Sequence, residues 1–297
     1  MKRVLKYLGY SLGALVLLLA VGVATIYAVS TRKLGRTYAV AVRPVAVPAD
    51  AASILRGRHI AETRGCIDCH GRDFGGAKVV DDPAVGQMWG ANLTGGSGSR
   101  TGAFTDGDWV RAIRHGVAQD GSPLVLMPSI EYSHFSDEDL GALVAYLKTL
   151  PKVDRMRIPV RVGPVARALI VAGQIKIAAE HIDHDGLRPA SVIPGVTVEY
   201  GHYLAVGCTG CHGEQLTGGR IPGAPPDWPA SRNLASGGDL ARWSEADFYK
   251  VLETGVRPDG KQLNPVMPLA FGKMNDVEKR ALWLYLKTLS SAATSAQ

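Results

Sequence analysis

Residues 66–70 read Cys-Ile-Asp-Cys-His, and residues 208–212 read Cys-Thr-Gly-Cys-His. These two copies of Cys-x-x-Cys-His use all four cysteines of the 297-residue chain. Two thiols at this spacing can each form a thioether with one vinyl group of a porphyrin, and the histidine that follows can bind the iron. The motifs therefore predict two covalently bound haem c groups. The predicted attachment residues and proximal iron ligands are Cys66, Cys69, His70, Cys208, Cys211 and His212.

Two other uses of paired cysteines fit the sequence less well. A structural zinc site can use two Cys-x-x-Cys pairs, but such pairs usually lie within one short module, and neither motif would need its histidine. A redox motif of the thioredoxin type belongs in a βαβ pattern, which the flanking sequence does not show. Haem attachment accounts for the cysteines and the histidines together.

The similarity between the two halves of the chain extends well beyond these motifs. Each motif is followed by a glycine, then by a Gly-Gly pair and, further on, by an Asn-Leu pair. The pentapeptide Tyr-Leu-Lys-Thr-Leu at 146–150 recurs without change at 285–289. Such a repeat indicates duplication of one domain of about 100 residues, which is a usual domain size. The sequence predicts a first domain at 53–150 and a second at 198–289.

The repeat also identifies candidates for the second iron ligand of each haem. A low-spin electron carrier needs a ligand on both faces of its haem. Of the six methionines, only Met127 and Met267 occupy matching places in the two halves, and a proline follows each in a loop between two predicted helices. A lone methionine usually fills a gap in a core, but the pairing across the repeat favours iron ligation for both.

Three other residues compete with Met127 for the first haem, namely Met88, His115 and His134. Neither histidine has a histidine counterpart in the second half of the chain. We therefore expect both histidines to be surface or loop residues that play no part in binding iron, and we expect Met127 to be the distal ligand.

Helix signals dominate both halves. A predicted helix leads into each motif, at 52–63 and at 198–205. The middle and last helices of each half begin with a capping residue that is followed by an acid three positions on. The caps are Thr105, Ser136, Ser244 and Asn275, and the stops of the middle helices are Gly116 and Gly255. Apolar residues recur at helical spacing in both last helices, and strand signals are sparse. The sequence therefore predicts an all-α fold.

Together these features resemble the class I cytochrome c superfamily. The resemblance is carried by the two Cys-x-x-Cys-His-Gly motifs, the Asn-Leu pairs, the Met-Pro dipeptides and the terminal Tyr-Leu-Lys helices. In particular, the chain is similar to the multihaem cytochrome c subunits that accompany periplasmic alcohol and aldehyde dehydrogenases. The resemblance implies two tandem class I cytochrome c domains, with haem attachment outside the cytoplasmic membrane. Those subunits often carry three haems, whereas this chain has motifs for two.

The N-terminal segment has the composition of a membrane span. Residues 8–29 contain no charge, and a helix of this length extends about 33 Å, enough for a bilayer core of about 30 Å. A cleaved signal peptide is the alternative, but its apolar core is usually only about 7–15 residues long. We therefore expect residues 1–36 to be a transmembrane anchor in the bacterial inner membrane, with the haem domains in the periplasm.

The net charge of +6 does not indicate nucleic-acid binding. The 33 Lys and Arg residues exceed the 27 Asp and Glu residues by the six bases of positions 1–36, where there is no acid. The remainder of the chain is formally neutral and has no basic stripe that would hold phosphates. The glycine-rich run at 95–98 lacks the Gly-Lys-Ser/Thr ending of a phosphate loop. We therefore expect no nucleic-acid partner.

Three segments lie outside the predicted domains: a tether at 37–52, a linker at 151–197 and a tail at 290–297. The linker includes an apolar stretch, 166–179, which is too short and too charged for a second span. We expect this stretch to pack across both domains, with contact to the membrane surface as the alternative. His181 and His184 follow it, and we expect them to be solvated or hydrogen-bonded, with a metal or second-haem role as the alternative.

Three functions are compatible with two haem c groups: electron transfer, peroxidase catalysis, and a structural role in a membrane complex. A peroxidase needs an iron position that is open to peroxide, whereas two irons with histidine and methionine ligands have none. The sequence therefore favours an electron carrier that is not itself an enzyme. We expect its donor to be a periplasmic dehydrogenase or a respiratory complex, and its acceptor to be another cytochrome or an oxidase.

Overall fold

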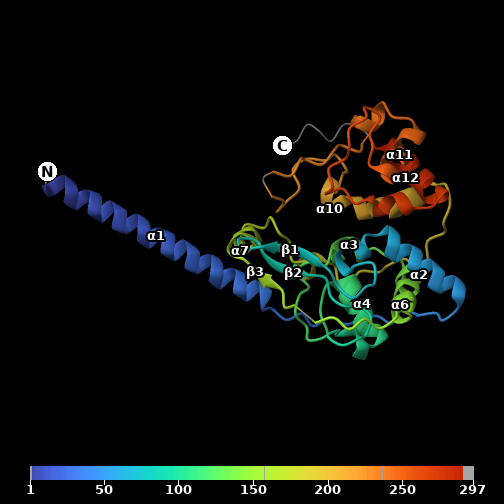
Figure 1. The fold of residues 1–297 in the computed structure, drawn as a ribbon, viewed down its shortest axis with the longest axis horizontal. Coiled ribbons are helices and arrows are strands. Elements are labelled where there is room, and N and C mark those ends of the chain that lie inside the picture. The colour runs from blue at the N-terminus through green and yellow to red at the C-terminus, as the bar shows by residue number, and fades with distance from the viewer. Residues whose placement is uncertain (1, 157, 226, 236, 290–297) are drawn as a thin grey trace.

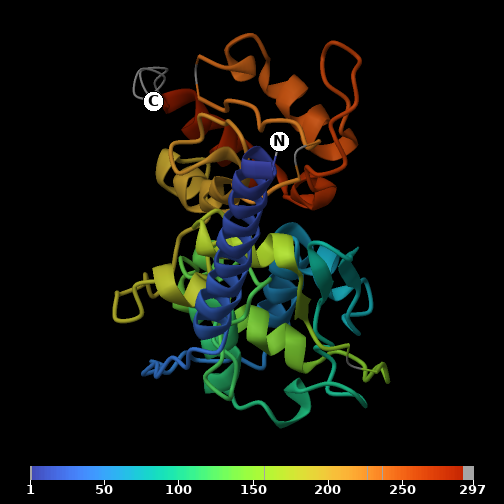
Figure 2. The same cartoon turned by 90° about the vertical axis from the view of Figure 1, so that its left-hand side faces the viewer.

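A computed structural model describes residues 2–156, 158–225, 227–235 and 237–289. The long helix α1 (Lys2–Leu34) projects from a body with two lobes, one stacked on the other (Figure 1). Residues 51–150 form the first lobe, here called the first unit, and residues 198–289 form the second unit. The predicted tail at 290–297 lies outside the described residues. Seen from the side on which α1 projects, the second unit lies above the first (Figure 2).

The two units present their helices in the same order. In the first unit the elements are α2 (Ala51–Thr63), α3 (Cys66–His70), β1 (Lys78–Asp82), β2 (Gly86–Trp89), η1 (Thr101–Ala103), α4 (Asp106–His115), α5 (Ser129–Tyr132) and α6 (Asp137–Lys148). In the second they are α9 (Val198–Ala205), η2 (Val206–Cys208), α10 (Thr209–His212), η3 (Asp239–Ala241), α11 (Glu245–Thr254), η4 (Leu269–Lys273) and α12 (Asp276–Thr288). The linker contributes β3 (Arg161–Val162), α7 (Pro164–Val171) and α8 (Ala178–His181).

The capping signals mark the helix ends as expected. The side chains of Thr105 and Ser244 each accept a hydrogen bond from the backbone of the aspartate three positions on, and that aspartate bonds back to the cap in both helices. Gly116 and Gly255 end these helices in the left-handed conformation, at φ 64° and 71°. Such caps satisfy backbone groups that a helix end leaves unpaired.

The first and last helices of each unit cross at a glycine. A Cβ on Gly57 in α2 would overlap the carbonyl oxygen of Ala142 in α6. A Cβ on Gly201 in α9 would overlap the carbonyl oxygen of Ala281 in α12 in the same way. The missing side chain allows the backbones to approach closely, so that the apolar faces of the last helices pack into the core. The core residues of those helices include Leu140, Leu143, Val144, Leu147, Leu282 and Leu286.

The protein is mostly helical, but it also contains a small sheet that the sequence did not predict. Strands β1 and β2 form an antiparallel hairpin, and β3 from the linker pairs antiparallel with β2. A Cβ on Gly86 would overlap the carbonyl oxygen of Arg161, so glycine permits this close pairing. In the matching region of the second unit, the described residues form one bridge, between Gly219 and Ser231.

The apolar stretch at 166–179 packs against residues of both units, as expected, and it also packs against helix α1, which the sequence did not indicate. Ile170 and Ile177 form a cluster with Val117 of the first unit and with Leu34 at the end of α1. It also approaches the second unit at Gly223, where an added Cβ would lie 2.7 Å from Ile175. The stretch therefore contacts the first unit, the second unit and α1.

Helix α1 is fixed to the body through its last two turns. Arg167 of α7 donates hydrogen bonds to the hydroxyls of Ser30 and Thr31, and Lys33 pairs with Glu180 at 2.8 Å. The rest of α1 is exposed. Within the described residues it is the one helix long and apolar enough to cross a membrane, although a signal sequence would pass the same test.

Candidate haem-binding site

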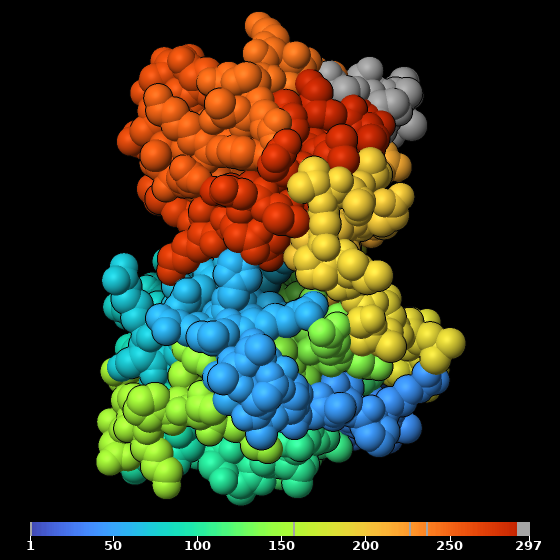
Figure 3. Space-filling model, turned by 90° about the vertical axis from the view of Figure 1, so that its right-hand side faces the viewer, coloured from blue at the N-terminus to red at the C-terminus, as the bar shows by residue number. Residues whose placement is uncertain are grey.

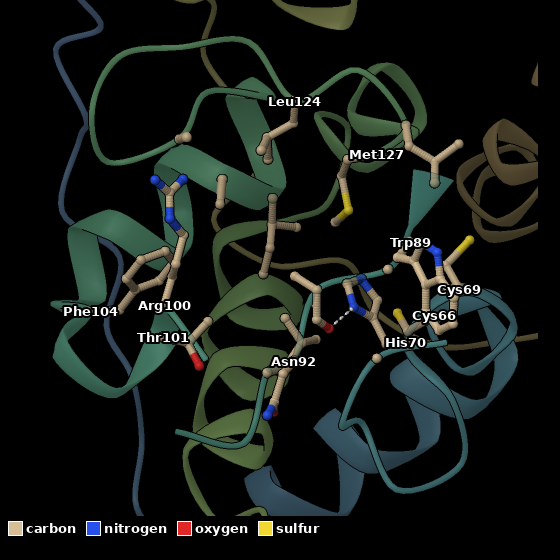
Figure 4. Close-up of a pocket in the computed structure, with 18 of the residues that line it drawn as sticks. Cys66, Cys69, His70, Trp89, Asn92, Arg100, Thr101, Phe104, Leu124 and Met127 are labelled. Carbon is tan, nitrogen blue, oxygen red and sulfur yellow. Dashed lines mark hydrogen bonds between the residues drawn. The ribbon is translucent and has the colours of Figure 1, made fainter. Parts of the chain in front are cut away.

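A cavity of about 380 Å³ lies in the first unit, within the size range of ligand pockets (Figure 4). The attachment motif forms one side of it, and Trp109, Leu143 and Leu147 contribute to its apolar lining. The motif residues Cys66, Cys69 and His70 and the predicted distal ligand Met127 all line this cavity. The structure thus brings together the four residues that the sequence assigned to the first haem.

His70 is positioned as an iron ligand by its ring hydrogen bond. Its Nδ1 lies 2.8 Å from the carbonyl oxygen of Ala91, which can only accept, so Nδ1 carries the proton and Nε2 is left with its lone pair. Burial lowers the pKa of His70, which keeps the ring neutral. A neutral imidazole whose other nitrogen donates to a carbonyl is the usual form of a metal-binding histidine.

Met127 enters the cavity from the opposite side. Its sulfur and the ring of His70 point toward one another across the cavity (Figure 4). The loop that carries Met127 is tied to the fold by two backbone bonds, from Leu124 N–H to Gly116 at 2.7 Å and from Ser129 N–H to Met127 at 2.8 Å. A flat macrocycle between His70 and Met127 would have one candidate ligand on each face.

The competing residues lie elsewhere. Met88 is buried on β2 and His134 is exposed, and neither contributes to the described lining of the cavity. The expectation that His115 is a surface or loop residue is wrong, because it is the last residue of α4 and only 4% exposed. Burial, together with nearby His184 and Arg114, lowers the pKa of His115 to about 4.

His115 has a structural partner in the linker. Its Nδ1 lies 3.0 Å from Nδ1 of His184, whose Nε2 lies 3.1 Å from the carbonyl oxygen of Ala179. That carbonyl requires a proton on Nε2 of His184, so Nδ1 of His184 accepts the proton of His115. The pair fastens the linker to α4. His184 is thus hydrogen-bonded and His181 is exposed, as expected.

Burial also shifts the pKa values of the attachment cysteines. It raises the pKa of Cys66 to about 12 and that of Cys208 to about 11, so both thiols stay protonated. Among the residues that the structure describes, no three His, Cys, Asp or Glu side chains converge as a metal site would require. The two cysteine pairs therefore do not come together as a zinc site.

Two residues beside the cavity have roles that sequence reasoning missed. Gly90 passes directly over the attachment motif, where a Cβ would overlap the carbonyl oxygen of Cys69. Arg155, from the linker, lines the cavity while it pairs with Asp73 and donates to the carbonyl of Gly76 at 2.8 Å. No local motif marks Arg155, because its role depends on the linker folding back over the first unit.

The cavity also has a second cation, Arg100, which pairs loosely with Asp120 at 3.5 Å. Arg100 and Arg155 are both partly solvent-exposed. A haem c carries two propionates, and guanidinium groups at the solvent edge of an apolar cavity suit carboxylates. The described residues therefore fit the group that the motif predicts, with an apolar interior and cationic edge.

The second unit repeats the backbone of the first around its own motif. Nδ1 of His212 lies 2.7 Å from the carbonyl oxygen of Arg232, and burial lowers the pKa of His212 as it does that of His70. Phe74 and Leu216, each four residues after the motif histidine, are the described non-glycine residues with left-handed backbone, at φ 55° and 57°. Such strained conformations persist only where the surroundings impose them.

Met267 lies in the same apolar cluster as Cys208, together with Leu240, Phe248 and Leu286 of the second unit. Its backbone N–H donates to the carbonyl of Asn264 at 3.0 Å. The methionine and the attachment cysteine of the second motif thus face one core, as Met127 and Cys66 do in the first unit.

The comparisons with known proteins agree in kind with this fold and this cavity, since both find similarity to cytochromes c. Residues 52–147 match the family described as cytochrome c oxidase, cbb3-type, subunit III. The chain as a whole is similar to cytochrome c subunits of dehydrogenases, such as the cytochrome c subunit of alcohol dehydrogenase (quinone) from Gluconacetobacter polyoxogenes. That protein is 29% identical over 258 residues, which cover 77% of this chain and 52% of the relative.

The names of two further relatives also describe cytochromes c. The gluconate 2-dehydrogenase cytochrome c subunit of Pantoea cypripedii is 29% identical over 79% of this chain and 56% of its own length. A diheme cytochrome c-type protein of Cereibacter sphaeroides is 26% identical over 78% of this chain and 84% of its own length. The chain thus spans only about half the length of the dehydrogenase subunits that it matches.

Proposed function

We propose that this protein is a membrane-anchored dihaem cytochrome c that passes single electrons from a periplasmic dehydrogenase to a downstream cytochrome or oxidase. The observation that carries the proposal is the opposition of His70 and Met127 across one apolar cavity. Two protein ligands on one iron leave no coordination position for a substrate, which argues for electron transfer and against peroxidase catalysis.

The chain's own residues hold and tune the cofactor. The haem supplies the one-electron chemistry when it is bound. His70 is kept in the ligating tautomer by the carbonyl of Ala91, and Met127 would favour the reduced state of a bound iron relative to a second histidine. Arg100 and Arg155, at the cavity edge, would supply positive charge to the propionates.

The second unit is proposed to bind a second haem c through Cys208, Cys211, His212 and Met267. Support comes from the matching bond of His212 to a carbonyl, from the shared strained turn at Leu216, and from alignments with relatives that extend beyond residues 52–147. On this proposal residues 53–150 and 198–289 are tandem cytochrome c domains, and residues 1–36, 37–52 and 151–197 are anchor, tether and linker.

The donor and the location are proposed from the relatives and from α1. Relatives named as subunits of alcohol, gluconate and fructose dehydrogenases support a dehydrogenase as the donor. The exposed apolar length of α1 supports a single span of the inner membrane, with both units in the periplasm, where haem c is attached.

Haem counting tests the proposal. Pyridine haemochrome quantitation of the purified full chain should give two haems, which remain on the polypeptide in a denaturing gel. Replacing both cysteines of one motif (Cys66→Ala with Cys69→Ala, or Cys208→Ala with Cys211→Ala) should leave one covalent haem in each case. A wild-type value of one would contradict the second site, and haem that extracts into acidic acetone would contradict covalent attachment.

A further inference from the structure

An open pocket lies at the end of α1, where that helix meets the body, and the haem sites do not use it. The residues that line this pocket, here called the foot pocket, are Thr31, Arg32, Gly35, Arg36 and Thr37. Arg32 is the first charged residue after the uncharged stretch of α1. The foot pocket therefore lies just beyond the segment proposed to cross the membrane, at the level of the lipid headgroups.

Positive charge is in excess around the foot pocket. The charged residues of positions 30–42 are Arg32, Lys33 and Arg36, and all three are bases. Lys33 pairs with Glu180 at 2.8 Å. Within the part of the chain that the structure describes, neither Arg32 nor Arg36 forms an ion pair. Arg167 of α7 adds a further base beside the pocket, because its guanidinium donates to the hydroxyls at the end of α1.

The face of the body that points away from α1 shows a different pairing of charges. Figure 3 shows that face, on which α2 is seen in light blue. Arg56 of α2 pairs with Glu138 and Asp139, each at 2.6 Å. Arg58 of the same helix pairs with Glu62 at 2.9 Å. The bases of α2 are thus matched by acids of the chain, whereas two bases of the foot pocket remain available for an anion from outside it.

The foot pocket offers the donors that a phosphate group binds. The hydroxyl of Thr31 accepts a hydrogen bond from Arg167 at 3.1 Å, which leaves its own proton free to donate. Arg36 is held over the ring of Tyr38, whose centroid lies 5.1 Å from the guanidinium carbon. Guanidinium groups bind phosphate oxygens through paired hydrogen bonds. Two guanidiniums and two threonine hydroxyls around one pocket therefore suit a phosphate.

The residues around the foot pocket also fit a membrane–water interface. Tyr27 lies under the guanidinium of Arg167 at 5.1 Å, and Tyr38 lies under that of Arg36. Tyrosine is enriched at the level where a span leaves the hydrocarbon core. Lys and Arg, in contrast, favour the cytoplasmic side of a span. Three bases on the side proposed to be periplasmic therefore indicate a role other than setting the orientation of α1.

We infer that the foot pocket binds the phosphate of an anionic phospholipid headgroup. Arg32 and Arg36 pair with its charge. The hydroxyls of Thr31 and Thr37 donate to its oxygens. The inference goes beyond the proposed function and rests on its membrane anchor, since α1 must bring the pocket to the bilayer surface. Free phosphate has the same chemistry as the headgroup, so the experiment has to separate the two sources.

The experiment uses the full-length holoprotein in detergent micelles that contain a small fraction of phosphatidylglycerol or, in a second sample, of phosphatidylcholine. A third sample contains phosphatidylglycerol with an excess of inorganic phosphate at the same ionic strength. Native mass spectrometry counts the lipids that stay bound when the micelle is removed. The variant is Arg32→Gln with Arg36→Gln. The matched control is Arg58→Gln with Arg242→Gln, which removes the same charge from exposed positions of the two units.

The wild type should retain one phosphatidylglycerol and little phosphatidylcholine, whose headgroup has no net charge. The double variant should retain about tenfold less phosphatidylglycerol, because two bases at a membrane surface supply much of the attraction to an anionic headgroup. The control should match the wild type. Equal retention in the wild type and the double variant, or equal retention of the two lipids, would overturn the inference. Displacement of the lipid by inorganic phosphate would overturn the assignment to a lipid headgroup.

The haem content of the same samples separates this inference from the proposed function. Two haems, with no loss of lipid in the double variant, would overturn the foot pocket alone. A mature chain whose N-terminus lies beyond residue 29 would contradict the anchor, and the inference would fail with it. If the double variant does not fold, Arg32→Gln alone decides, since Arg32 has no ion pair among the described residues and its loss should reduce lipid retention in the same direction.

Discussion

The two units share a backbone plan around the attachment motif but differ in the segments that surround it. Both cross their first and last helices at a glycine, bond the motif histidine to a carbonyl, and place a non-glycine residue in the left-handed conformation four positions later. The first unit adds the β1–β2 hairpin and the linker residue Arg155. The backbone features that hold the motif are thus repeated, whereas the hairpin and Arg155 beside the cavity belong to the first unit.

The largest expected effect concerns the distal ligands, where the units should behave alike. Replacement of Met127 or Met267 by histidine should lower the reduction potential of the haem in that unit alone, because a thioether raises the potential of haem iron relative to imidazole. Alanine at either place should open one iron and produce a high-spin fraction. Redox titration and visible spectra of the oxidised protein measure both effects.

Met88→Leu is the control for these substitutions, because Met88 is buried on β2 and apart from the cavity. It should leave both potentials unchanged. If Met127→Ala leaves both potentials unchanged and Met88→Leu shifts one, then Met88 is the ligand and the units are not chemically equivalent.

The next effect compares the two helix crossings. Gly57→Ala and Gly201→Ala each insert a methyl group where a carbonyl oxygen of the facing helix already lies, so the helices must separate. Overpacking of this kind typically costs about 1–3 kcal/mol. Chemical denaturation followed by haem absorbance should show a similar loss of unfolding free energy for both. Gly107→Ala, whose Cβ would meet nothing closer than 3.7 Å, should be neutral or stabilising. A large loss of unfolding free energy in only one of these two variants would show that the two helix crossings are not equivalent.

The sequence predicted the local features of this fold well because local rules determine them. The ranges 52–63 and 198–205 agree with α2 and α9 to within one residue. Caps such as Thr105 and Ser244 mark helix starts through hydrogen bonds that span three residues. Met127 was predicted as a partner of His70 by the repeat alone, and the structure brings both residues to one cavity.

The features that the sequence did not predict depend on contacts between distant segments. Strand β1 is short, largely exposed and mostly charged, and the third strand of the sheet comes from the linker. His115 was misassigned because its burial requires His184, which lies 69 positions away. The sequence did not indicate that the apolar stretch at 166–179 packs against α1, because the two segments are far apart in the chain and α1 supplies part of the surface that the stretch covers.

A pH effect should reveal the contact between His59 in α2 of the first unit and Glu278 in α12 of the second, whose side chains lie 2.6 Å apart. Burial alone would raise the pKa of Glu278, but the bond to His59 and the charge of Arg64 hold that pKa below its ordinary value of 4.5. The stabilisation from the ionised carboxylate is therefore present near neutral pH and is lost as the pH falls below about 4.5. Glu278→Gln keeps the helix cap, so its loss of unfolding free energy should shrink steadily in acid. A loss that is constant from neutral to acidic pH would contradict this account.

The smallest effect concerns the capping boxes of α4 and α11. Thr105→Ala and Ser244→Ala each remove one cap hydroxyl, which typically costs about 1 kcal/mol. The two boxes have nearly the same geometry, with 2.7 Å between the hydroxyl and the carboxylate in both. Asp108, however, is buried and also bonds Arg111 and Gln119, whereas Asp247 has no second side-chain partner among the described residues. Because loss of a partner costs more at a buried acid, Thr105→Ala should lower the unfolding free energy more than Ser244→Ala does. Denaturation of the two variants side by side measures the difference, and a larger loss for Ser244→Ala would show that burial of the acid does not set the strength of the cap.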